Sequence, residues 1–193
     1  LFMPPKFAFF DDDLAFGDAK LFCQIFGQMR VRMAVNGWGS DGDFYGTTDA
    51  GGNSNYGTVF KITPAGVLTT LHSFNLTNGS GPDAGLVQGS DGGFYGTTIV
   101  GGGGGDGTVF RITPTGVLTT LHRFNGTNGR TPRARLVQGS DGDFYGTTFQ
   151  GGASNYGTVF KITPAGTLTT LHCFNEVDGL NPSAGAVFGT DGK

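Results

Sequence analysis

The chain has 193 residues, including 37 glycines and 18 phenylalanines, and its formal net charge at pH 7 is −3. This glycine content is far above the usual share of about 7 % and disfavours helices, while the 12 % of aromatic residues argues against a disordered glycine-rich linker. With 14 % charged residues the chain lacks the basic surface of a nucleic-acid-binding protein, and no apolar run reaches the roughly 18 residues of a membrane-spanning helix.

Residues 1–38 differ from the remainder of the chain and are treated as a separate N-terminal segment. Apolar residues from Phe22 to Met33 recur at helical spacing, which predicts a helix beginning near Asp18. The alternative is a degraded blade, that is, a degenerate copy of the 50-residue repeat that fills the remainder of the chain. It is suggested by Leu21-Phe22-Cys23, which lies three repeat periods before Leu171-His172-Cys173. A disulfide between Cys23 and Cys173 is not expected, since equivalent positions of different repeats are too far apart to bridge.

From Gly39 onward the sequence repeats with a period of 50 residues and no gaps. The motif Gly-Ser-Asp-Gly at 39–42 returns at 89–92 and 139–142, and as Gly-Thr-Asp-Gly at 189–192. The tandem repeats therefore occupy residues 39–88, 89–138 and 139–188, with a partial repeat at 189–193. Self-similarity at a fixed period of this length indicates a repeat architecture.

Each repeat is predicted to contain four antiparallel strands. In the second repeat, apolar, aromatic and β-branched runs place the strands at 86–90, 94–98, 108–113 and 117–124. Asp91-Gly92 predicts a tight type I′ hairpin turn, because glycine adopts positive φ without strain. Pro114-Thr115-Gly116 predicts the turn between the third and fourth strands.

Four antiparallel strands in each unit predict an all-β fold, specifically a β-propeller fragment of four-stranded blades with a 50-residue period. A parallel β-helix is less consistent with the sequence, since it would not place hairpin turns in every unit. Propellers close with four to eight blades, so three repeats imply either a longer protein or assembly of several copies. We expect the isolated chain to self-associate through its uncapped end blades and to be marginally stable.

The repeated sequence Gly-Ser-Asp-Gly-x-Phe-Tyr-Gly-Thr-Thr, followed by Gly-Thr-Val-Phe-Lys/Arg-Ile-Thr-Pro-x-Gly, resembles one family. It is similar to the GloVer tandem repeat of bacterial "choice-of-anchor" surface proteins, over Gly39 to Lys193. The paired glycines after the second strand are also similar to kelch blades. The resemblance implies a secreted or cell-surface bacterial protein of undefined molecular function, and it brings no catalytic residues.

The recurring histidines and aspartates are interpreted as structural. Equivalent residues of diverging blades should not meet, so His72, His122 and His172 are not expected to form a metal site. Asp41, Asp91, Asp141 and Asp191 each precede a glycine and are interpreted as turn residues. No metal site, cofactor or catalytic residue is predicted.

The loops that differ between repeats are the candidate ligand-binding positions, although surface loops also vary without functional cause. These positions are Asn53, Asn55, Tyr56, Asp106, Arg130, Arg133, Arg135, Asn155, Tyr156, Glu176 and Asp178. The three arginines predict a cationic spot suited to a carboxylate or sulfate.

The sequence favours a non-catalytic binding or structural module for an extracellular glycan or protein partner. We expect the chain neither to bind nucleic acids nor to span a membrane. The alternative is a propeller-type hydrolase or lyase acting on polysaccharide, with its catalytic residues outside this chain.

Overall fold

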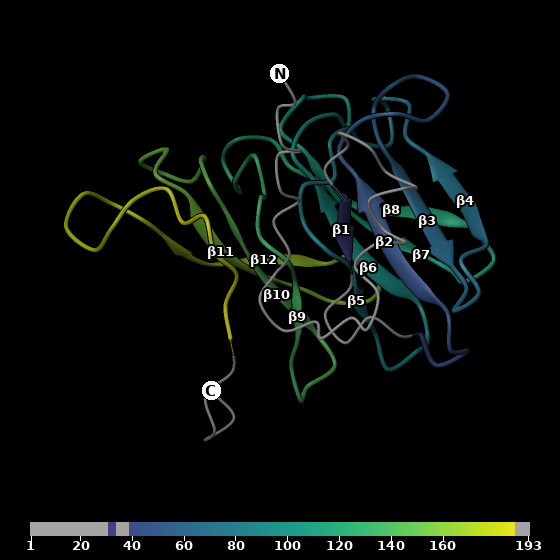
Figure 1. Cartoon of the computed structure of the whole chain (residues 1–193). Helices are drawn as coiled ribbons and strands as arrows, with labels where there is room; N and C mark the ends of the chain where they lie inside the picture. The colour runs from purple at the N-terminus through teal and green to yellow at the C-terminus, as the bar shows by residue number, and fades with distance from the viewer. Residues whose placement is uncertain (1–30, 34–38, 188–193) are drawn as a thin grey trace, which may run out of the picture.

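The structure, a computed structural model, describes residues 31–33 and 39–187, and the regular elements in these residues are all β-strands. They form three antiparallel sheets, called here blades 1, 2 and 3 in chain order (Figure 1). Blade 1 consists of β1 (Val31–Met33), β2 (Phe44–Thr48), β3 (Thr58–Ile62) and β4 (Leu68–Ser73). Blade 2 consists of β5 (Val87–Gln88), β6 (Phe94–Thr98), β7 (Thr108–Ile112) and β8 (Leu118–Arg123). Blade 3 consists of β9 (Val137–Gln138), β10 (Phe144–Thr148), β11 (Thr158–Ile162) and β12 (Leu168–Cys173).

The predicted four-stranded antiparallel blade is confirmed in all three sheets. In each blade the strands lie side by side in chain order. The first strands β1, β5 and β9 lie near the centre of the view, while β4 lies at its right-hand edge (Figure 1). Helices would be disfavoured by the glycine content, whereas the Phe-Tyr-Gly-Thr-Thr and Thr-Val-Phe-Lys/Arg-Ile segments are rich in strand-forming residues.

The 50-residue period extends to the pairing register. Phe44 is opposite Ile62 in blade 1, and the same pairs recur as Phe94 with Ile112 and Phe144 with Ile162. The third and fourth strands share a β-bulge at the same place in every blade. The repeat is therefore a unit of backbone geometry as well as of sequence.

Residues Val31–Met33 pair with the distal half of β2, where Val31 is opposite Thr48 and Met33 is opposite Gly46. Helical spacing had placed Met33 in a helix, but it lies in β1, because its backbone completes the open edge of β2. The other residues of the predicted helix lie outside the described residues, as does Cys23. Cys173 is a free thiol at the end of β12.

The hairpin predicted at Asp91-Gly92 is confirmed, but its geometry differs from the expected type I′ turn. The Gly92 N–H donates to the Gly89 carbonyl, and the Gly89 N–H donates to the Gly93 carbonyl. Gly92 has a φ of 76°, whereas Asp91 is not among the residues with positive φ. A type I turn is therefore followed by one left-handed glycine, an arrangement in which only that glycine needs positive φ. Because this turn occupies 89–93, the first strand is shorter than predicted.

Hydrophobic burial takes place mainly between blades, in two seams. Tyr45 of blade 1 stacks on Phe94 of blade 2, with ring centroids 3.9 Å apart, and Tyr95 stacks on Phe144 at 3.8 Å. The seam of blades 1 and 2 buries Tyr45, Val59, Phe74, Leu86, Phe94, Phe110 and Ile112. The seam of blades 2 and 3 buries Tyr95, Val109, Phe124, Leu136, Phe144, Phe160 and Ile162. Each position in the first seam has its counterpart 50 residues later, so the same packing is built twice.

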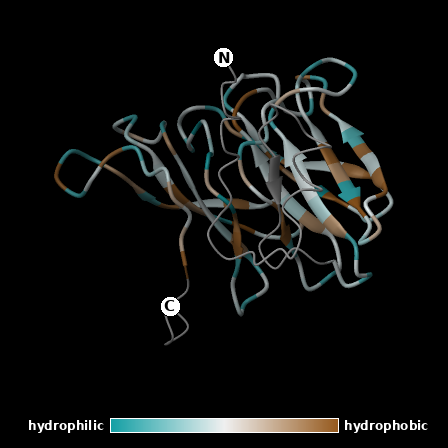
Figure 2. Cartoon of the chain, viewed as in Figure 1, coloured by the Kyte–Doolittle hydropathy of each residue, from teal (hydrophilic) through white to brown (hydrophobic). Residues whose placement is uncertain are grey.

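The exposed loops carry most of the hydrophilic colour, while hydrophobic stretches lie along the strands (Figure 2). Among the described residues no helix is long and apolar enough to cross a membrane.

Candidate functional site

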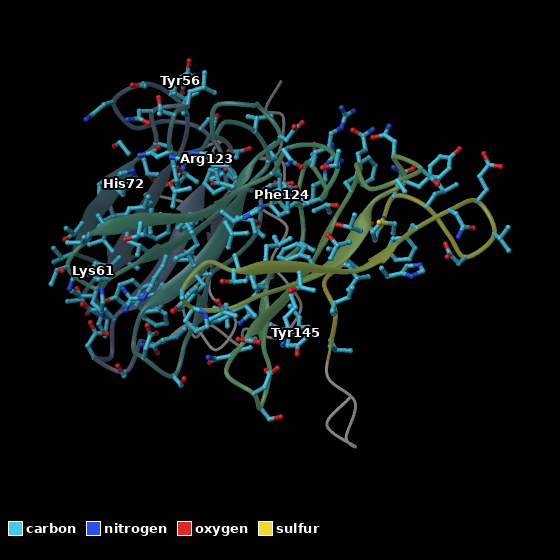
Figure 3. All side chains as sticks on the ribbon, turned by 180° about the vertical axis from the view of Figure 1, so that it is seen from behind. Tyr56, Lys61, His72, Arg123, Phe124 and Tyr145 are labelled. Carbon is cyan, nitrogen blue, oxygen red and sulfur yellow. The ribbon has the colours of Figure 1, made fainter. Side chains whose placement is uncertain are left out.

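The blades present two chemically different ends. The turn face comprises the short turns at 39–43, 63–67 and their equivalents, and the loop face comprises the longer loops at 49–57, 74–86 and their equivalents. In Figure 3, Tyr56 marks the loop face at the top, while Tyr145 lies toward the bottom.

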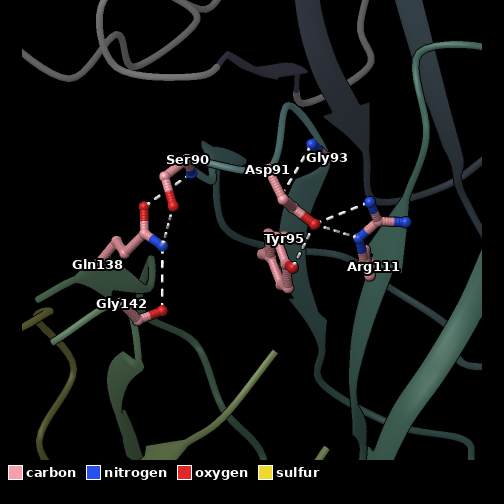
Figure 4. Close-up of polar contacts among 7 residues, drawn as sticks. All are labelled: Ser90, Asp91, Gly93, Tyr95, Arg111, Gln138 and Gly142. Carbon is pink, nitrogen blue, oxygen red and sulfur yellow. Dashed lines mark hydrogen bonds and ion pairs between the residues drawn. The ribbon is translucent and has the colours of Figure 1, made fainter. Parts of the chain in front are cut away.

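On the turn face, Asp91 is held by hydrogen bonds from three sides (Figure 4). Its Oδ1 accepts the Gly93 N–H at 3.0 Å, and its Oδ2 accepts the Tyr95 hydroxyl at 3.0 Å and the Arg111 Nε–H at 2.9 Å. Burial works against ionisation of Asp91, but the bonds from Gly93, Arg111 and Tyr95 outweigh it and hold the pKa of this carboxyl below its ordinary value. All three donors belong to the same blade as Asp91, which indicates a structural role.

The basic residue of this network differs between blades, and it changes together with the residue two positions after the turn aspartate. Blades 1 and 3 carry Asp43 and Asp143, which pair with Lys61 and Lys161, each at 2.8 Å. Blade 2 has Gly93 at this position and an arginine, Arg111, as the cation. A Cβ atom on Gly93 would lie 2.7 Å from the Arg111 Nε, so the guanidinium occupies the space of the missing side chain.

We therefore expect Gly93→Asp and Arg111→Lys to be coupled. Gly93→Asp alone should destabilise blade 2 by about 1–3 kcal/mol through overpacking against Arg111. The double variant reproduces the pairs of blades 1 and 3 and should recover most of that loss. Urea unfolding of the two single variants and the double variant measures the coupling energy. Additive effects of the two changes would contradict this interpretation.

A second polar contact of the turn face joins neighbouring blades. Gln138 of blade 3 accepts the Ser90 N–H at 3.0 Å through Oε1 and donates through Nε2 to the Gly142 carbonyl at 3.0 Å (Figure 4). Gln138 Nε2 also donates to the Ser90 hydroxyl oxygen at 3.3 Å, and Gln88 Nε2 donates to the Ser40 hydroxyl oxygen at the same distance. The turn face is thus fixed by contacts that repeat from blade to blade, and its chemistry differs little between repeats.

The loop face is held together by backbone hydrogen bonds between blades. The Gly81 N–H donates to the Tyr56 carbonyl at 3.0 Å, and the Gly81 carbonyl accepts the Ile99 N–H of the next blade at 3.1 Å. Thr131 repeats this arrangement with Asp106, at 2.9 Å, and Phe149, at 3.1 Å. The blade-to-blade loop is therefore a fixed strap between two neighbouring loops, and it can hold side chains in defined positions.

Several of the predicted loop positions serve the loops themselves. Asn55 and Asn155 have a φ of 60°, and their Oδ1 atoms accept the N–H of Gly51 and Gly151 at 2.9 and 3.1 Å. In blade 2 this left-handed position is Gly105, which accounts for part of the glycine-rich loop. These asparagines close their loops, while Asn53 is exposed. Tyr56 packs against the seam of blades 1 and 2.

The structure places the three predicted arginines along the strap between blades 2 and 3. Arg130 donates through Nε and Nη2 to Oε1 of Gln150, at 3.1 and 2.9 Å. Arg133 is exposed, and its guanidinium lies 4.3 Å from the centroid of the Phe149 ring. Arg135 donates to the Leu86 carbonyl at 3.1 Å. Arg130 and Arg133 are thus oriented by neutral groups of the next blade.

The two carboxylates unique to the third repeat each contact a side chain that recurs in other repeats. The Tyr156 hydroxyl donates to Glu176 Oε1 at 2.6 Å, and Asp178 Oδ2 lies 2.9 Å from His172 Nε2. The contact between His172 and Asp178 was not predicted from the sequence. The available signal was that Asp178 takes the place of Asn78 and Asn128, six residues after each histidine.

The histidines act within their own repeats. Nε2 of His72 contacts the Asn78 side-chain amide at 2.9 Å, as His122 contacts Asn128, and each ring packs edge-on against the phenylalanine two residues later. Figure 3 shows His72 well separated from Phe124 of the next blade. In the described residues no group of three or more histidine, cysteine or acidic side chains gathers in a way that could hold a metal ion.

Burial and the Asn128 side chain act in opposite directions on the pKa of His122. Burial lowers the pKa of His122, and the contact with Asn128 offsets part of this effect. The unfolded chain therefore binds a proton more readily, so stability should fall as the pH drops below about 6.5. Asn128→Asp should raise the pKa of His122 by placing a carboxylate beside it and should reduce this loss. An NMR titration of the imidazole measures the pKa, with Asn128→Ala as the uncharged control. A pKa that is equal in the Asp and Ala variants would contradict the argument.

The comparisons with known proteins agree with this architecture. A family model described as the Gloeobacter/Verrucomicrobia repeat matches residues 27–193, which confirms the resemblance found in the repeated motif and includes part of the N-terminal segment. No curated protein matches the chain.

Several solved structures resemble the chain at low sequence identity. Virginiamycin B lyase from Staphylococcus aureus superposes with a TM-score of 0.55 and 20 % identity, over 79 % of this chain and 44 % of the lyase. A gluconolactonase from Xanthomonas campestris superposes with a TM-score of 0.50 and 12 % identity, over 81 % of this chain and 55 % of that chain. The chain therefore spans about half the length of these proteins or less, and the likeness establishes a propeller-like fold alone.

Proposed function

Because the chain belongs to the Gloeobacter/Verrucomicrobia repeat family, we propose that it is part of a non-catalytic, exported or surface-displayed binding module whose loop face takes an anionic ligand. The location outside the cell rests on the resemblance to surface-protein repeats. The ligand class rests on the geometry of the strap between blades 2 and 3, where loops differ between repeats.

The observation that carries the proposal is the fixing of Arg130 and Arg133 by neutral groups of the next blade. Gln150 and Phe149 orient both guanidinium groups without neutralising their charge. Neither pair exists between blades 1 and 2, where the equivalent arginine positions are Ser80 and Asp83. Planar guanidinium groups held at a surface suit carboxylate or sulfate groups, which favours an acidic glycan as the ligand.

Calorimetric titration with polygalacturonate and dextran sulfate, with neutral dextran as the control polymer, tests this proposal. We expect binding of the charged polymers at low salt, weakening as ionic strength rises. Replacing Arg130, Arg133 and Arg135 with serine should abolish it, while Arg123→Ser, which removes an exposed arginine from β8, should leave it intact. Unchanged binding by the triple variant, or no binding by the native chain at low salt, would overturn the proposal. An acidic peptide that competes with the glycan would indicate a protein partner at the same site.

A hydrolase or lyase is the second candidate function. Two similar structures are named as enzymes, and a histidine-to-alanine variant of the lyase, solved with quinupristin, is described as catalytically inactive. In this chain the Asp178 carboxylate holds the His172 imidazole, an arrangement that can support proton transfer. Turnover of a lactone or of quinupristin that is lost in His172→Ala and retained in His122→Ala would favour this candidate.

A further inference from the structure

The two seams show which residues pack against the outward face of a blade, the face that it turns toward the following blade. Blades 1 and 2 present Tyr45, Val59 and Phe74, or their equivalents, to the following blade. The following blade contributes a leucine before its first strand, a phenylalanine in its second strand, and a phenylalanine and an isoleucine in its third. In the two seams these residues are Leu86, Phe94, Phe110 and Ile112, and Leu136, Phe144, Phe160 and Ile162.

Blade 3 exposes the equivalent face. Phe74 and Phe124 are 1 % and 2 % exposed, whereas Phe174 is only partly buried. Val159 is likewise partly exposed, although Val59 and Val109 are fully buried. The blade-to-blade loop adds further apolar surface at its tip (Figure 2), where Val177 is 95 % and Leu180 is 55 % exposed.

The backbone of the outer strand shows the same unfilled contact. In blades 2 and 3 the glycine of the Pro-x-Gly turn packs on the bulged leucine of the preceding blade, so that a Cβ atom on Gly116 or Gly166 would lie 2.7 Å from the carbonyl oxygen of Leu71 or Leu121. The equivalent residue of blade 3, Leu171, is 50 % exposed. Side chain and backbone therefore point to the same missing neighbour.

A second copy of this chain cannot supply that neighbour through its first blade. Phe44, Phe60 and Ile62 are the residues that blade 1 would bring to such a contact, and they are already 9 %, 1 % and 3 % exposed. A partner must instead offer a free set of equivalent residues, which a further blade of the same repeat carries.

We propose that the outward face of blade 3 is an interface for a fourth blade of this repeat. That blade presents a Phe-Phe-Ile set to Val159 and Phe174, and its Pro-x-Gly turn packs on Leu171. The isolated pairs of Ser80 with Val100 and Arg130 with Gln150 place residues 20 positions apart opposite each other, so Leu180 faces the residue 20 positions later in the added blade. The proposal is independent of the anionic ligand, and without the fourth blade the exposed face drives self-association.

The test appends a copy of residues 89–138 directly after residue 188, in register with the repeat. Phe174→Ser is then compared in the native and extended chains, with Phe124→Ser as the reference. In the extended chain Phe174→Ser should lower the melting temperature by about 10 °C, the effect also expected of Phe124→Ser, and in the native chain by only a few degrees.

A matched extension, with serine in place of the two phenylalanines in the added blade, should leave Phe174→Ser as mild as in the native chain. Equal effects of Phe174→Ser in all three backgrounds would overturn the proposal. An extended chain that melts no higher than the serine-substituted extension would overturn it as well.

Discussion

Replacing Phe110 with alanine is expected to destabilise the chain by about 3–5 kcal/mol, because the side chain is fully buried in the seam between blades 1 and 2. Its ring lies edge-on to Phe74, with centroids 5.3 Å apart. A contact of this kind adds about 0.5–1.5 kcal/mol to the burial of area. Gly96 faces the same ring so closely that a Cβ atom there would lie 2.6 Å from Phe110. The absence of a side chain at position 96 therefore leaves the space that the Phe110 ring fills.

Denaturant unfolding measures this effect, and two further variants make the comparison specific. Phe160→Ala removes the equivalent ring from the next seam and should cost a similar amount, since both rings are fully buried. Val117→Ala, at a position that is 62 % exposed in the same blade, should change the free energy of unfolding by less than about 0.5 kcal/mol. A Phe110→Ala variant that loses no more stability than Val117→Ala would show that the seams do not carry the fold.

Gly107→Ala is expected to be as damaging as the loss of a core ring, although it adds only a methyl group. Gly107 has a φ of 95°, and a Cβ atom there would overlap the Thr98 carbonyl oxygen and lie 2.9 Å from Pro132 Cδ. The left-handed conformation costs about 1–2 kcal/mol for a side chain, and overpacking adds about 1–3 kcal/mol. The total loss should therefore be about 3 kcal/mol.

Gly103→Ala provides the matched control. Gly103 lies in the same loop with a φ of 91°, but nothing lies within 4 Å of its Cβ position. This variant should lose only the conformational part, about 1–2 kcal/mol. Equal stabilities of the two variants, measured by thermal unfolding, would show that the loop relaxes and that Gly107 is not needed for close approach of the chain.

The period of the sequence was enough to predict the blade, because strands and turns depend on local residue chemistry. Phe-Tyr-Gly-Thr-Thr and the Pro-x-Gly turn recur unchanged, so the second, third and fourth strands were placed within a few residues. The turn type at Asp91-Gly92 was predicted incorrectly, since Asp-Gly is compatible with several turns. The choice depends on hydrogen bonds that the surrounding strands permit.

The candidate site was predicted less completely than the fold. The sequence showed which loop residues differ between repeats, but not that Asn55 and Asn155 close their own loops. It grouped Arg130, Arg133 and Arg135 by proximity in the chain, whereas Arg130 and Arg133 are oriented by the next blade and Arg135 by the Leu86 carbonyl. Gln150 and Phe149 are more than fifteen residues away in sequence, so local patterns carried no information about these contacts.

By itself, then, the sequence determined the repeat, the four-stranded unit and the family, since each follows from residue types at short spacing. The tertiary structure alone decided which residues face a neighbouring blade. Tyr45 stacks on Phe94 because the fold brings together segments that are distant in the sequence, and such contacts depend on packing in three dimensions. The number of repeats predicted uncapped end blades, but only the structure showed that Leu171 of blade 3 is exposed while Phe60 and Ile62 of blade 1 are buried, because exposure is a property of how blades pack.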